Sequence, residues 1–374
     1  MIPVYIYPFS PQELDNRMFL ENVSGAERAS RDNVQLRVFE YLRRECEKHG
    51  LALNTCDHFD LRRRQRSVHV FMRAWPYEHL AQRDDVILSS YHIWEAPVLI
   101  DWLPGDQFNR LEAIAASFNR VYAVPTLDSI RTVVSNIPEH TRIIKGFVHQ
   151  PYSDVMPALW SRRKRKPLVL IANYNLAPSR LPEYYSERVR AVGHFARLNT
   201  IDLYGRGWDL AAEAGLLGTL NSAIRKKTYV GDLVTFRYRR EIANSWMGGG
   251  VSDKLAALSQ YDYCICYESS GFDGFVTEKI FDAFVAGTIP IYYGAPDIYE
   301  YIPRDCFIDF RAFHDYLELS RFLMDMTEMK RTQYRTAARD FLLSSRYHCF
   351  SKEAFARQFI LEVHSDFSLR WGGA

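Results

Sequence analysis

Short apolar runs typical of strands alternate with stretches of helical periodicity, and this alternation limits the possible folds more than any other feature of the sequence. Strands are predicted at residues 3–9, 68–72, 85–88 and 120–124, and helices at 33–49 and 110–119. The first of these helices carries apolar residues at near-helical spacing and meets Gly50 where a helix would stop. Strands that alternate with helices predict a parallel sheet covered by helices, which is an α/β fold.

The alternation is interrupted near the middle of the chain and then restarts. The interruption is residues 161–167, a basic run that ends in Pro167. After it, strands are predicted at 168–172, 199–204, 261–267 and 289–293, and helices at 183–195, 253–259 and 277–286. A chain of 374 residues suits two domains. We therefore predict a first domain over 1–160, a linker over 161–167 and a second domain over 168–349.

Two segments leave a choice between ordinary packing and contact with a membrane surface. The basic run at 161–167 is typical of a solvated connector, and contact with an acidic membrane surface is the alternative. Residues 350–374 are predicted to hold a C-terminal helix with an amphipathic stretch, marked by Phe355, Phe359, Ile360 and Val363. That helix either crosses back to pack on the first domain, which we favour, or lies on a membrane.

Composition and charge exclude several classes of protein. A net charge of +2 leaves no electrostatic footprint for nucleic acid. The six cysteines show no metal-ligand spacing, although Cys264 and Cys266 would share one face of a strand, so free thiols in a reducing compartment are expected. No apolar run reaches the roughly 18 residues of a membrane span. We expect a cytoplasmic protein, with peripheral contact at the inner membrane face left open.

The segment from Tyr267 to Ile280 is the richest in candidate chemistry. A strand ends near Tyr267, a loop with two glycines follows, and a helix begins around Thr277. The unsatisfied N–H groups of a helix start attract anions, and Lys279 lies in the same first turn, where a lysine is unfavourable for the helix dipole. A bound diphosphate would explain that placement. The alternative is that Thr277 simply caps the helix and Lys279 is a surface lysine.

Other signatures of nucleotide binding are missing from the chain. The sequence contains no Gly-x-x-x-x-Gly-Lys-Ser/Thr loop and no Asp-x-Asp, the pattern with which many transferases hold a nucleotide sugar through a metal. We therefore predict no tightly bound metal, with a divalent ion as a stimulator at most, and expect basic side chains to neutralise the diphosphate. The isolated histidines His149, His194 and His348 are expected to have structural roles.

The stretch 267–313 resembles the donor-binding signature of the α1,3/4-fucosyltransferases. That family shows Phe-Glu-Asn-Ser, a short loop, Tyr-Val/Ile-Thr-Glu-Lys and a strand that ends in Gly-x-Pro. Here Val-Thr-Glu-Lys stands at 276–279 and Gly-Ala-Pro at 294–296. Shorter resemblances follow the family order at 94–97, 171–173, 187–190, 202–206 and 302–310. The chain departs from the family at Ser269, where Asn is usual, and at Phe275, where Tyr is common.

The resemblance implies a GT-B fold, in which two Rossmann-like domains face each other across a cleft. It also implies an inverting transfer of fucose from GDP-fucose to a glycan hydroxyl, for example on N-acetylglucosamine, with the acceptor in the first domain. Glu95 matches the general base, and Arg188 and Lys279 match the groups that stabilise the leaving GDP. The other residues expected to bind the donor are Asn173, Tyr267, Glu268, Phe275, Thr277 and Glu278.

Two other functions remain open. A GT-B transferase that uses a different nucleotide sugar is favoured by the two departures at Ser269 and Phe275. A catalytically silent protein that binds a glycan or a nucleotide is the second. A dinucleotide oxidoreductase is disfavoured, because neither domain has a Gly-x-Gly-x-x-Gly after its first strand.

Overall fold

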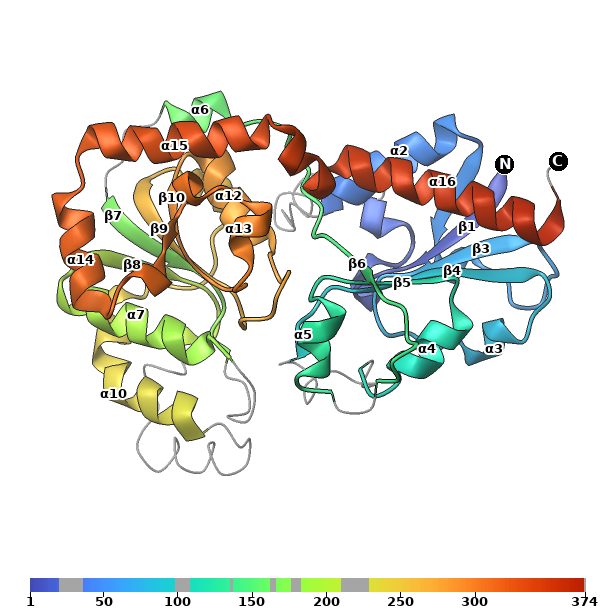
Figure 1. The fold of residues 1–374 in the computed structure, drawn as a ribbon, viewed down its shortest axis with the longest axis horizontal. Helices are drawn as coiled ribbons and strands as arrows, with labels where there is room; N and C mark the ends of the chain where they lie inside the picture. The colour runs from blue at the N-terminus through green and yellow to red at the C-terminus, as the bar shows by residue number, and fades with distance from the viewer. Residues whose placement is uncertain are drawn as a thin grey trace. The chain divides into compact units, whose positions relative to one another are not determined.

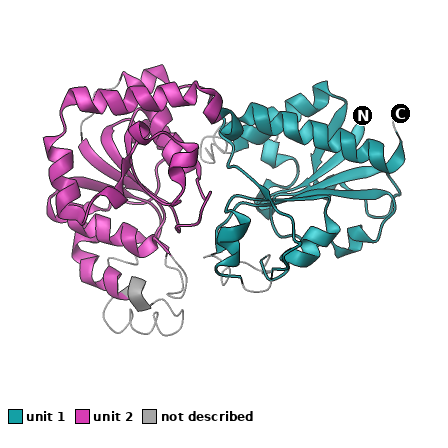
Figure 2. Cartoon of the chain, in the orientation of Figure 1, with its two compact units in different colours: residues 1–152, 348–374 teal, residues 153–347 magenta. Residues whose placement is uncertain are grey.

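The computed structural model describes residues 1–19, 36–97, 108–134, 137–161, 166–175, 183–209 and 229–372. The chain divides into two compact units (Figure 2). Unit 1 comprises residues 1–152 together with 348–374, and unit 2 comprises residues 153–347.

Unit 1 is built on a six-stranded parallel sheet with the order β2-β1-β3-β4-β5-β6 (Figure 1). Its strands are β1 (Ile2–Tyr7), β2 (Leu51–Thr55), β3 (Ser67–Phe71), β4 (Val86–Ile93), β5 (Arg120–Ala123) and β6 (Ile144–Lys145). Alternation along β1 sends Val4 and Ile6 to one face of the sheet, and Tyr5 and Tyr7 to the other. Both faces of the sheet are therefore buried, as a parallel sheet requires.

Helices cover the two faces of this sheet. The helices α2 (Leu36–Lys48) and α16 (Lys352–Trp371) pack over Val4 and Ile6. The opposite face is covered by α3 (Glu78–Ala81), α4 (Leu111–Ser117) and α5 (Leu127–Arg131). In α16 the buried carboxylate of Asp366 accepts two hydrogen bonds from Arg120 Nη1, at 3.0 and 2.8 Å, and one from Ser89 Oγ at 2.5 Å. The C-terminal helix therefore belongs to unit 1.

Unit 2 has a five-stranded parallel sheet with the order β11-β10-β9-β7-β8. Its strands are β7 (Lys166–Ile171), β8 (Ile201–Tyr204), β9 (Tyr261–Tyr267), β10 (Ile289–Tyr293) and β11 (Ile308–Asp309). The helices α7 (Tyr185–Arg197), α10 (Tyr229–Ser245) and α14 (Tyr316–Asp325) lie on one side, and α11 (Lys254–Leu258), α12 (Glu278–Ala286) and α15 (Glu328–Leu342) on the other (Figure 1). Cys264 and Cys266 of β9 do share a face, with their Sγ atoms 3.1 Å apart, and all six cysteines are free.

Counted along each unit, both sheets contain the strand order 2-1-3-4-5 of doubly wound α/β folds. In such sheets ligands bind at the carboxyl ends of the strands, next to the point where the strand order reverses. In unit 2 that point lies between β7 and β9, and in unit 1 it lies between β1 and β3. The predicted fold class, two parallel-sheet α/β domains, is confirmed.

The boundaries between the units differ from the predicted ones. The chain enters unit 2 after Tyr152, because the helix α6 (Pro157–Trp160) packs on α12, where Trp160 Nε1 donates to Phe284 O at 3.1 Å. The predicted linker 161–167 is also too long at its end, since Lys166 and Pro167 already belong to β7. Residues 162–165 of that linker lie outside the described residues.

A histidine in the unit 1 core makes the stability of this unit dependent on pH. His69 on β3 is 0% exposed and lies between the hydroxyls of Tyr7, at 3.2 Å, and Ser67, at 3.0 Å. Burial, and then the charge of Arg83, lower the pKa of His69 to about 3. The unfolded chain, with an ordinary histidine pKa near 6.5, binds this proton at a higher pH. The stability that neutral His69 contributes is therefore lost as the pH falls from about 6.5 towards 3.

We expect His69→Gln to reduce the acid sensitivity of folding. Between pH 7.5 and 5.0 the wild-type protein should lose about 2 kcal/mol through this one group, and the variant should lose that much less. Urea unfolding at the two pH values, followed by circular dichroism, measures the difference. His140→Gln, at an exposed position, is the control. An equal loss in the wild type and in His69→Gln would contradict the expectation.

Candidate active site

The strongest candidate site lies at the carboxyl end of the central strand of unit 2. The strand β9 ends at Tyr267, and the loop that follows leads into α12, whose N-cap is Thr277. The helix ends at Gly287, which has a φ of 70° and terminates it in the left-handed conformation that favours glycine. Strand, loop and helix together place the predicted donor-binding segment at the edge of the sheet where such folds bind ligands.

The carboxylate of Glu268 is the centre of this loop. It is 0% exposed and accepts hydrogen bonds from the backbone N–H of Thr277 at 2.9 Å, from Thr277 Oγ1 at 3.0 and 2.8 Å, and from Lys279 Nζ at 2.9 Å. Gly294 makes room for it, because a Cβ at position 294 would lie 2.6 Å from Glu268 Cγ. A buried charge is tolerated only when it is paired and hydrogen-bonded in this way.

The alternative interpretation made Thr277 a capping side chain and Lys279 a surface lysine, and neither residue has that role. Thr277 makes no side-chain capping bond, since its hydroxyl is hydrogen-bonded to Glu268 and accepts from Lys279 Nζ at 2.7 Å. Lys279 is not a surface lysine: its side chain is 26% exposed and pairs with the buried carboxylate. The first turn of α12 is thus held by the Glu268 side chain from the loop before it.

Charges of both signs alternate around the start of α12. The Glu278 carboxylate lies 3.7 Å from Lys279 Nζ. Burial opposes the ionisation of Glu278, but Lys279 and Lys254 outweigh it and lower the pKa of Glu278 to about 2. Burial likewise opposes the charge on Lys279, yet Glu268 and Glu278 raise its pKa. Both groups are therefore charged at neutral pH, and a ligand anion must share Lys279 with Glu268.

Arg188 reaches the same end of β9 from the helix α7. Its Nε and Nη2 atoms donate to the carbonyl oxygen of Tyr267 at 3.1 and 2.7 Å, and its guanidinium lies 4.9 Å from the centre of the Tyr185 ring. Among the described residues, nothing accepts a hydrogen bond from the remaining nitrogen, Nη1. Burial lowers the pKa of Arg188, while nearby groups that include Glu268 oppose that change.

The other predicted donor-binding residues divide into buried and exposed ones. The rings of Tyr267 and Phe275 are only 1% and 2% exposed and belong to the interior of unit 2, so they shape the site from within. Asn173 is exposed just after β7, and its Oδ1 accepts from the backbone N–H of Arg206 at 2.9 Å. The structure thus brings Arg188, Tyr267, Glu268, Thr277, Glu278 and Lys279 together in one cluster.

Three further residues around this cluster were missed by sequence reasoning. Tyr184 stacks on Tyr293 with ring centres 4.0 Å apart, and its backbone N–H donates to Ser269 O at 2.8 Å. Lys254 pairs with the buried carboxylate of Asp282 at 2.7 Å. Asp282 lies four residues after Glu278 on the same helix, a spacing that could have linked the two. Nothing in the sequence near Lys254 or Tyr184 indicates their partners.

The predicted base, Glu95, lies in unit 1. It follows β4 by two residues and is exposed at the carboxyl end of that strand. This is the edge of the unit 1 sheet at which ligands bind in such folds. Glu95 and the Lys279 cluster therefore belong to different units.

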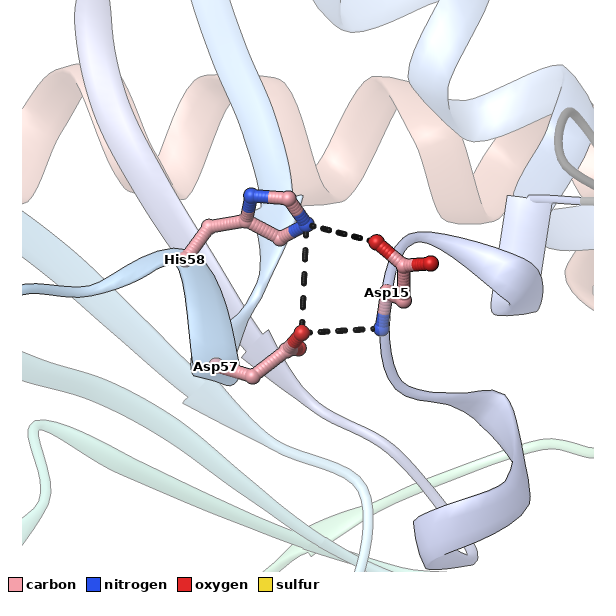
Figure 3. A group of neighbouring side chains, drawn as sticks. All are labelled: Asp15, Asp57 and His58. Atoms are coloured by element: carbon pink, nitrogen blue, oxygen red, sulfur yellow. Dashed lines mark hydrogen bonds and ion pairs between the residues drawn. The ribbon is translucent and has the colours of Figure 1, made fainter.

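One group in the described part of the chain has donor atoms close enough to hold a metal ion. It consists of Asp15, Asp57 and His58 in unit 1, all exposed (Figure 3). His58 Nε2 lies 3.7 Å from Asp15 Oδ1 and 3.8 Å from Asp57 Oδ2, and Asp15 N donates to Asp57 Oδ2 at 2.9 Å. These contacts fasten the turn at Asp15 to the end of β2, which accounts for the group without an ion. None of its members belongs to the Lys279 cluster.

Two solved structures share this two-unit fold. A HepE protein of Anabaena, solved with UDP and glucose, aligns with a TM-score of 0.53 and 10% identity, over 98% of this chain and 100% of its own. A glycosyltransferase of Rickettsia africae aligns with a TM-score of 0.51 and 12% identity, over 100% and 99%. At these identities the likeness concerns the fold alone. In its fold the chain is similar to the GT-B glycosyltransferases.

Part of the sequence of unit 2 is similar to a known family. Residues 244–339 match the family described as glycosyltransferase family 10 (fucosyltransferase), C-terminal part. An α-(1,3)-fucosyltransferase of Helicobacter pylori is 36% identical over 80 residues, which is 21% of this chain and 17% of that protein. The 4-galactosyl-N-acetylglucosaminide 3-α-L-fucosyltransferase 9 of Mus musculus is 34% identical over 83 residues, which is 21% and 23%. Residues 244–339 are thus similar to the C-terminal part of the family 10 fucosyltransferases, and the resemblance seen in the sequence is confirmed over that segment.

Among the described helices, none combines the length and the apolar character that a membrane span needs.

Proposed function

We propose that this protein is an inverting fucosyltransferase that moves fucose from GDP-fucose to a glycan hydroxyl in α1,3 linkage, for example on an N-acetylglucosamine of a surface oligosaccharide. The observation that carries the proposal is the Glu268–Thr277–Lys279 cluster, because it lies in the segment that matches the family and at the sheet edge where nucleotides bind. The names of the relatives in Helicobacter pylori and Mus musculus support fucose as the sugar.

The reaction requires a base on the acceptor side. The acceptor oxygen attacks the anomeric carbon of fucose from the face opposite GDP, while the bond from that carbon to the phosphate oxygen breaks and GDP leaves with the electron pair. The acceptor hydroxyl must give up its proton as it attacks. Glu95, exposed at the carboxyl end of β4, is the carboxylate that we assign to accept this proton.

The leaving diphosphate requires cations where its negative charge develops. We assign this role to Lys279, which would exchange part of its contact with Glu268 for a phosphate oxygen, and to Nη1 of Arg188, from which no described residue accepts a hydrogen bond. Glu278, ionised and partly exposed, can only accept hydrogen bonds, which suits ribose or sugar hydroxyls. Asn173, exposed after β7, is assigned to the donor as well. With the diphosphate charge met by these cations, no tightly bound metal is part of the proposal, and a divalent ion would stimulate at most.

Ser269 and Phe275 depart from the family pattern, and these departures favour a donor other than GDP-fucose only if the two side chains contact the donor. Ser269 is buried, and its backbone oxygen accepts from Tyr184, while the Phe275 ring lies in the interior of unit 2. Both departures therefore change packing around the site more directly than contacts with a sugar. The six free cysteines suit a reducing compartment, so we place the reaction in the cytosol, with peripheral contact at the inner membrane face open.

A panel of nucleotide sugars tests the donor and the role of Lys279. We expect GDP release from GDP-fucose that depends on added glycan acceptors. Lys279→Met should weaken GDP binding and lower turnover by roughly 10²–10³, because one cation at the developing charge is lost. Lys330→Met, at an exposed position of unit 2, is the control and should match the wild type.

The other outcomes of the panel are equally informative. Acceptor-dependent turnover with a different nucleotide sugar alone would keep the transferase and remove fucose. Tight GDP binding without turnover on any acceptor would favour the catalytically silent binding protein. Full activity of Lys279→Met would exclude Lys279 as the diphosphate ligand.

A further inference from the structure

The ion pair of Lys254 and Asp282 has no part in the reaction as proposed, although it lies next to residues that have one. Lys254 is the first residue of α11, and its Nζ lies 2.7 Å from Oδ2 of Asp282 on α12. The Asp282 side chain is 2% exposed, and that of Lys254 is 27% exposed. The other end of α11 is also fastened, because Thr288 Oγ1 donates to Leu258 O at 2.6 Å. The pair therefore joins two helices that pack against each other.

Lys254 begins its helix at the carboxyl edge of the unit 2 sheet. Before α11 the chain passes the end of β8, where the backbone N–H of Gly205 donates to Gly249 O at 2.7 Å. Asp253 is the N-cap of α11, and its side chain accepts from the backbone N–H of Ala256 at 2.8 Å. The helix then leads to the amino end of β9. Lys254 thus lies at the same edge of the sheet as the start of α12.

The ammonium of Lys254 acts on two carboxylates of α12. Glu278 and Asp282 are four residues apart, so their side chains are neighbours on one side of the helix, where like charges repel. Burial opposes the charge on Lys254, but Asp282 and then Glu278 raise its pKa. In return, Lys254 joins Lys279 in overcoming the burial that opposes the ionisation of Glu278. The charged side chains that act on Glu278 thus include Lys279 and Asp282 of α12, Lys254 of α11 and Arg188 of α7.

Stability does not account for this ion pair. Oδ1 of Asp282 is buried and has no hydrogen-bond partner among the described residues. Burial raises the pKa of Asp282, and Lys254 offsets that change only in part. The hydration lost on burying such a pair can exceed the attraction between its charges, and apolar replacements are often neutral or stabilising. The effect of Lys254 on its neighbour Glu278 accounts for the placement better than the bond to Asp282 does.

We propose that Lys254 is a positioning residue of the donor site: anchored by Asp282, its ammonium holds the Glu278 carboxylate in the orientation that accepts hydroxyls of the bound donor. Lys279 is the other cation beside Glu278, at 3.7 Å, and in the proposed function it turns towards a phosphate oxygen. Lys254 remains with Glu278 when the donor is bound, because Asp282 holds it at 2.7 Å. The proposal rests on the proposed function in making Glu278 a donor contact, but the effect of Lys254 on Glu278 can be measured without nucleotide.

The first test follows the Glu278 carboxyl group in the full chain without nucleotide. Lys254→Gln with Asp282→Asn, the amide pair, replaces the two charges by amides that can still bond to each other, so no buried charge is left unpaired. Carbon-13 NMR of labelled glutamate identifies the signal that Glu278→Gln removes. Between pH 8 and 4.5 this signal should not titrate in the wild type. In the amide pair its midpoint should rise by about 1–3 pH units, the usual effect of losing one nearby cation, so the signal should begin to move.

Two comparisons assign that change to the lost ammonium. Asp282→Asn alone removes a like charge beside Glu278, which works against a rise. Arg197→Gln with Glu241→Gln is the matched control, because it removes an ion pair of 2.7 Å between α7 and α10 of the same unit. If the amide pair does not fold, Lys254→Met with Asp282→Leu, an apolar pair, takes its place. An unchanged Glu278 signal in the folded variant would overturn the proposal and leave fucosyl transfer standing.

Calorimetry with GDP-fucose then tests whether Lys254 acts through Glu278. The amide pair should weaken binding about tenfold, and Glu278→Gln by a similar factor, as expected when a hydrogen bond to a charged group is lost. All three substitutions together should lose no more than Glu278→Gln alone, because Lys254 then has no carboxylate to position. Additive losses, as damage to the fold would give, would overturn the proposal. A shifted Glu278 signal in a protein that binds no GDP-fucose would support the effect of Lys254 on Glu278 and remove the proposed function.

Discussion

Replacement of Glu95 by glutamine should lower kcat for fucosyl transfer by about 10²–10⁴-fold, the usual contribution of a general base. The amide keeps the size and the hydrogen bonding of the side chain but cannot take the proton of the acceptor hydroxyl. Glu95 is exposed at the carboxyl end of β4, so the change should leave folding intact. GDP affinity should also be unchanged, because the donor cluster lies in unit 2.

The measurement is GDP release at saturating GDP-fucose and acceptor, with GDP binding followed by calorimetry. Glu112→Gln, an exposed carboxylate on α4 of the same unit, should behave as the wild type. Turnover of Glu95→Gln within a factor of ten of the wild type would assign the proton to another group. A parallel loss of GDP affinity would instead indicate damage beyond the base.

Replacement of Glu268 by alanine should destabilise the protein by about 3–5 kcal/mol, because it removes the buried carboxylate that holds the start of α12 and leaves the partly buried Lys279 with only its longer contact to Glu278. The change removes the acceptor of the Thr277 N–H, of the Thr277 hydroxyl and of Lys279 Nζ at once. It also opens space beside Gly294. Urea unfolding followed by circular dichroism measures the loss, with the exposed Glu300→Ala as the control.

A double substitution separates lost pairing from lost packing. If the loss of pairing at Lys279 dominates, Glu268→Ala together with Lys279→Met should be more stable than Glu268→Ala alone, because the poorly paired charge is gone. An unfolding midpoint of Glu268→Ala equal to that of the wild type would show that the cluster does not stabilise the start of α12. Additive losses in the double variant would show that the two side chains act separately.

Local patterns predicted the elements in which one face is clearly apolar. The strand β9 was predicted with the bounds that the structure has, and α12 to within one residue, because tyrosines, cysteines and phenylalanines recur there at regular spacing. The strand β2 was missed, since its five residues include Ala52 and Asn54, and pairing with β1 is what makes them a strand. The helix α15 was missed because most of its residues are polar and only Ala338, Phe341 and Leu342 are buried.

In the candidate site, too, local patterns were predicted and long-range contacts were missed. The segment 276–279 could be recognised from the sequence, because a loop that enters a helix start with a lysine in its first turn is a local pattern. The partners of that segment could not. Arg188 meets the carbonyl of Tyr267, 79 positions later, and Lys254 meets Asp282 from a separate helix. These contacts depend on the order of strands in the sheet, which no local periodicity encodes.

By itself the sequence determined the two parallel-sheet domains, the similarity of 267–313 to the fucosyltransferases and the loop with Lys279, because periodicity and short motifs are properties of neighbouring residues. Only the tertiary structure decided that the Glu268 carboxylate is buried and paired with Lys279, that α16 completes unit 1, and that the isolated His149 lines a cavity. The walls of that cavity come from strands and a helix that are distant in sequence. These strands and this helix come together because of the order of the parallel strands and the helices that cover the sheet. Both depend on the burial of whole apolar faces.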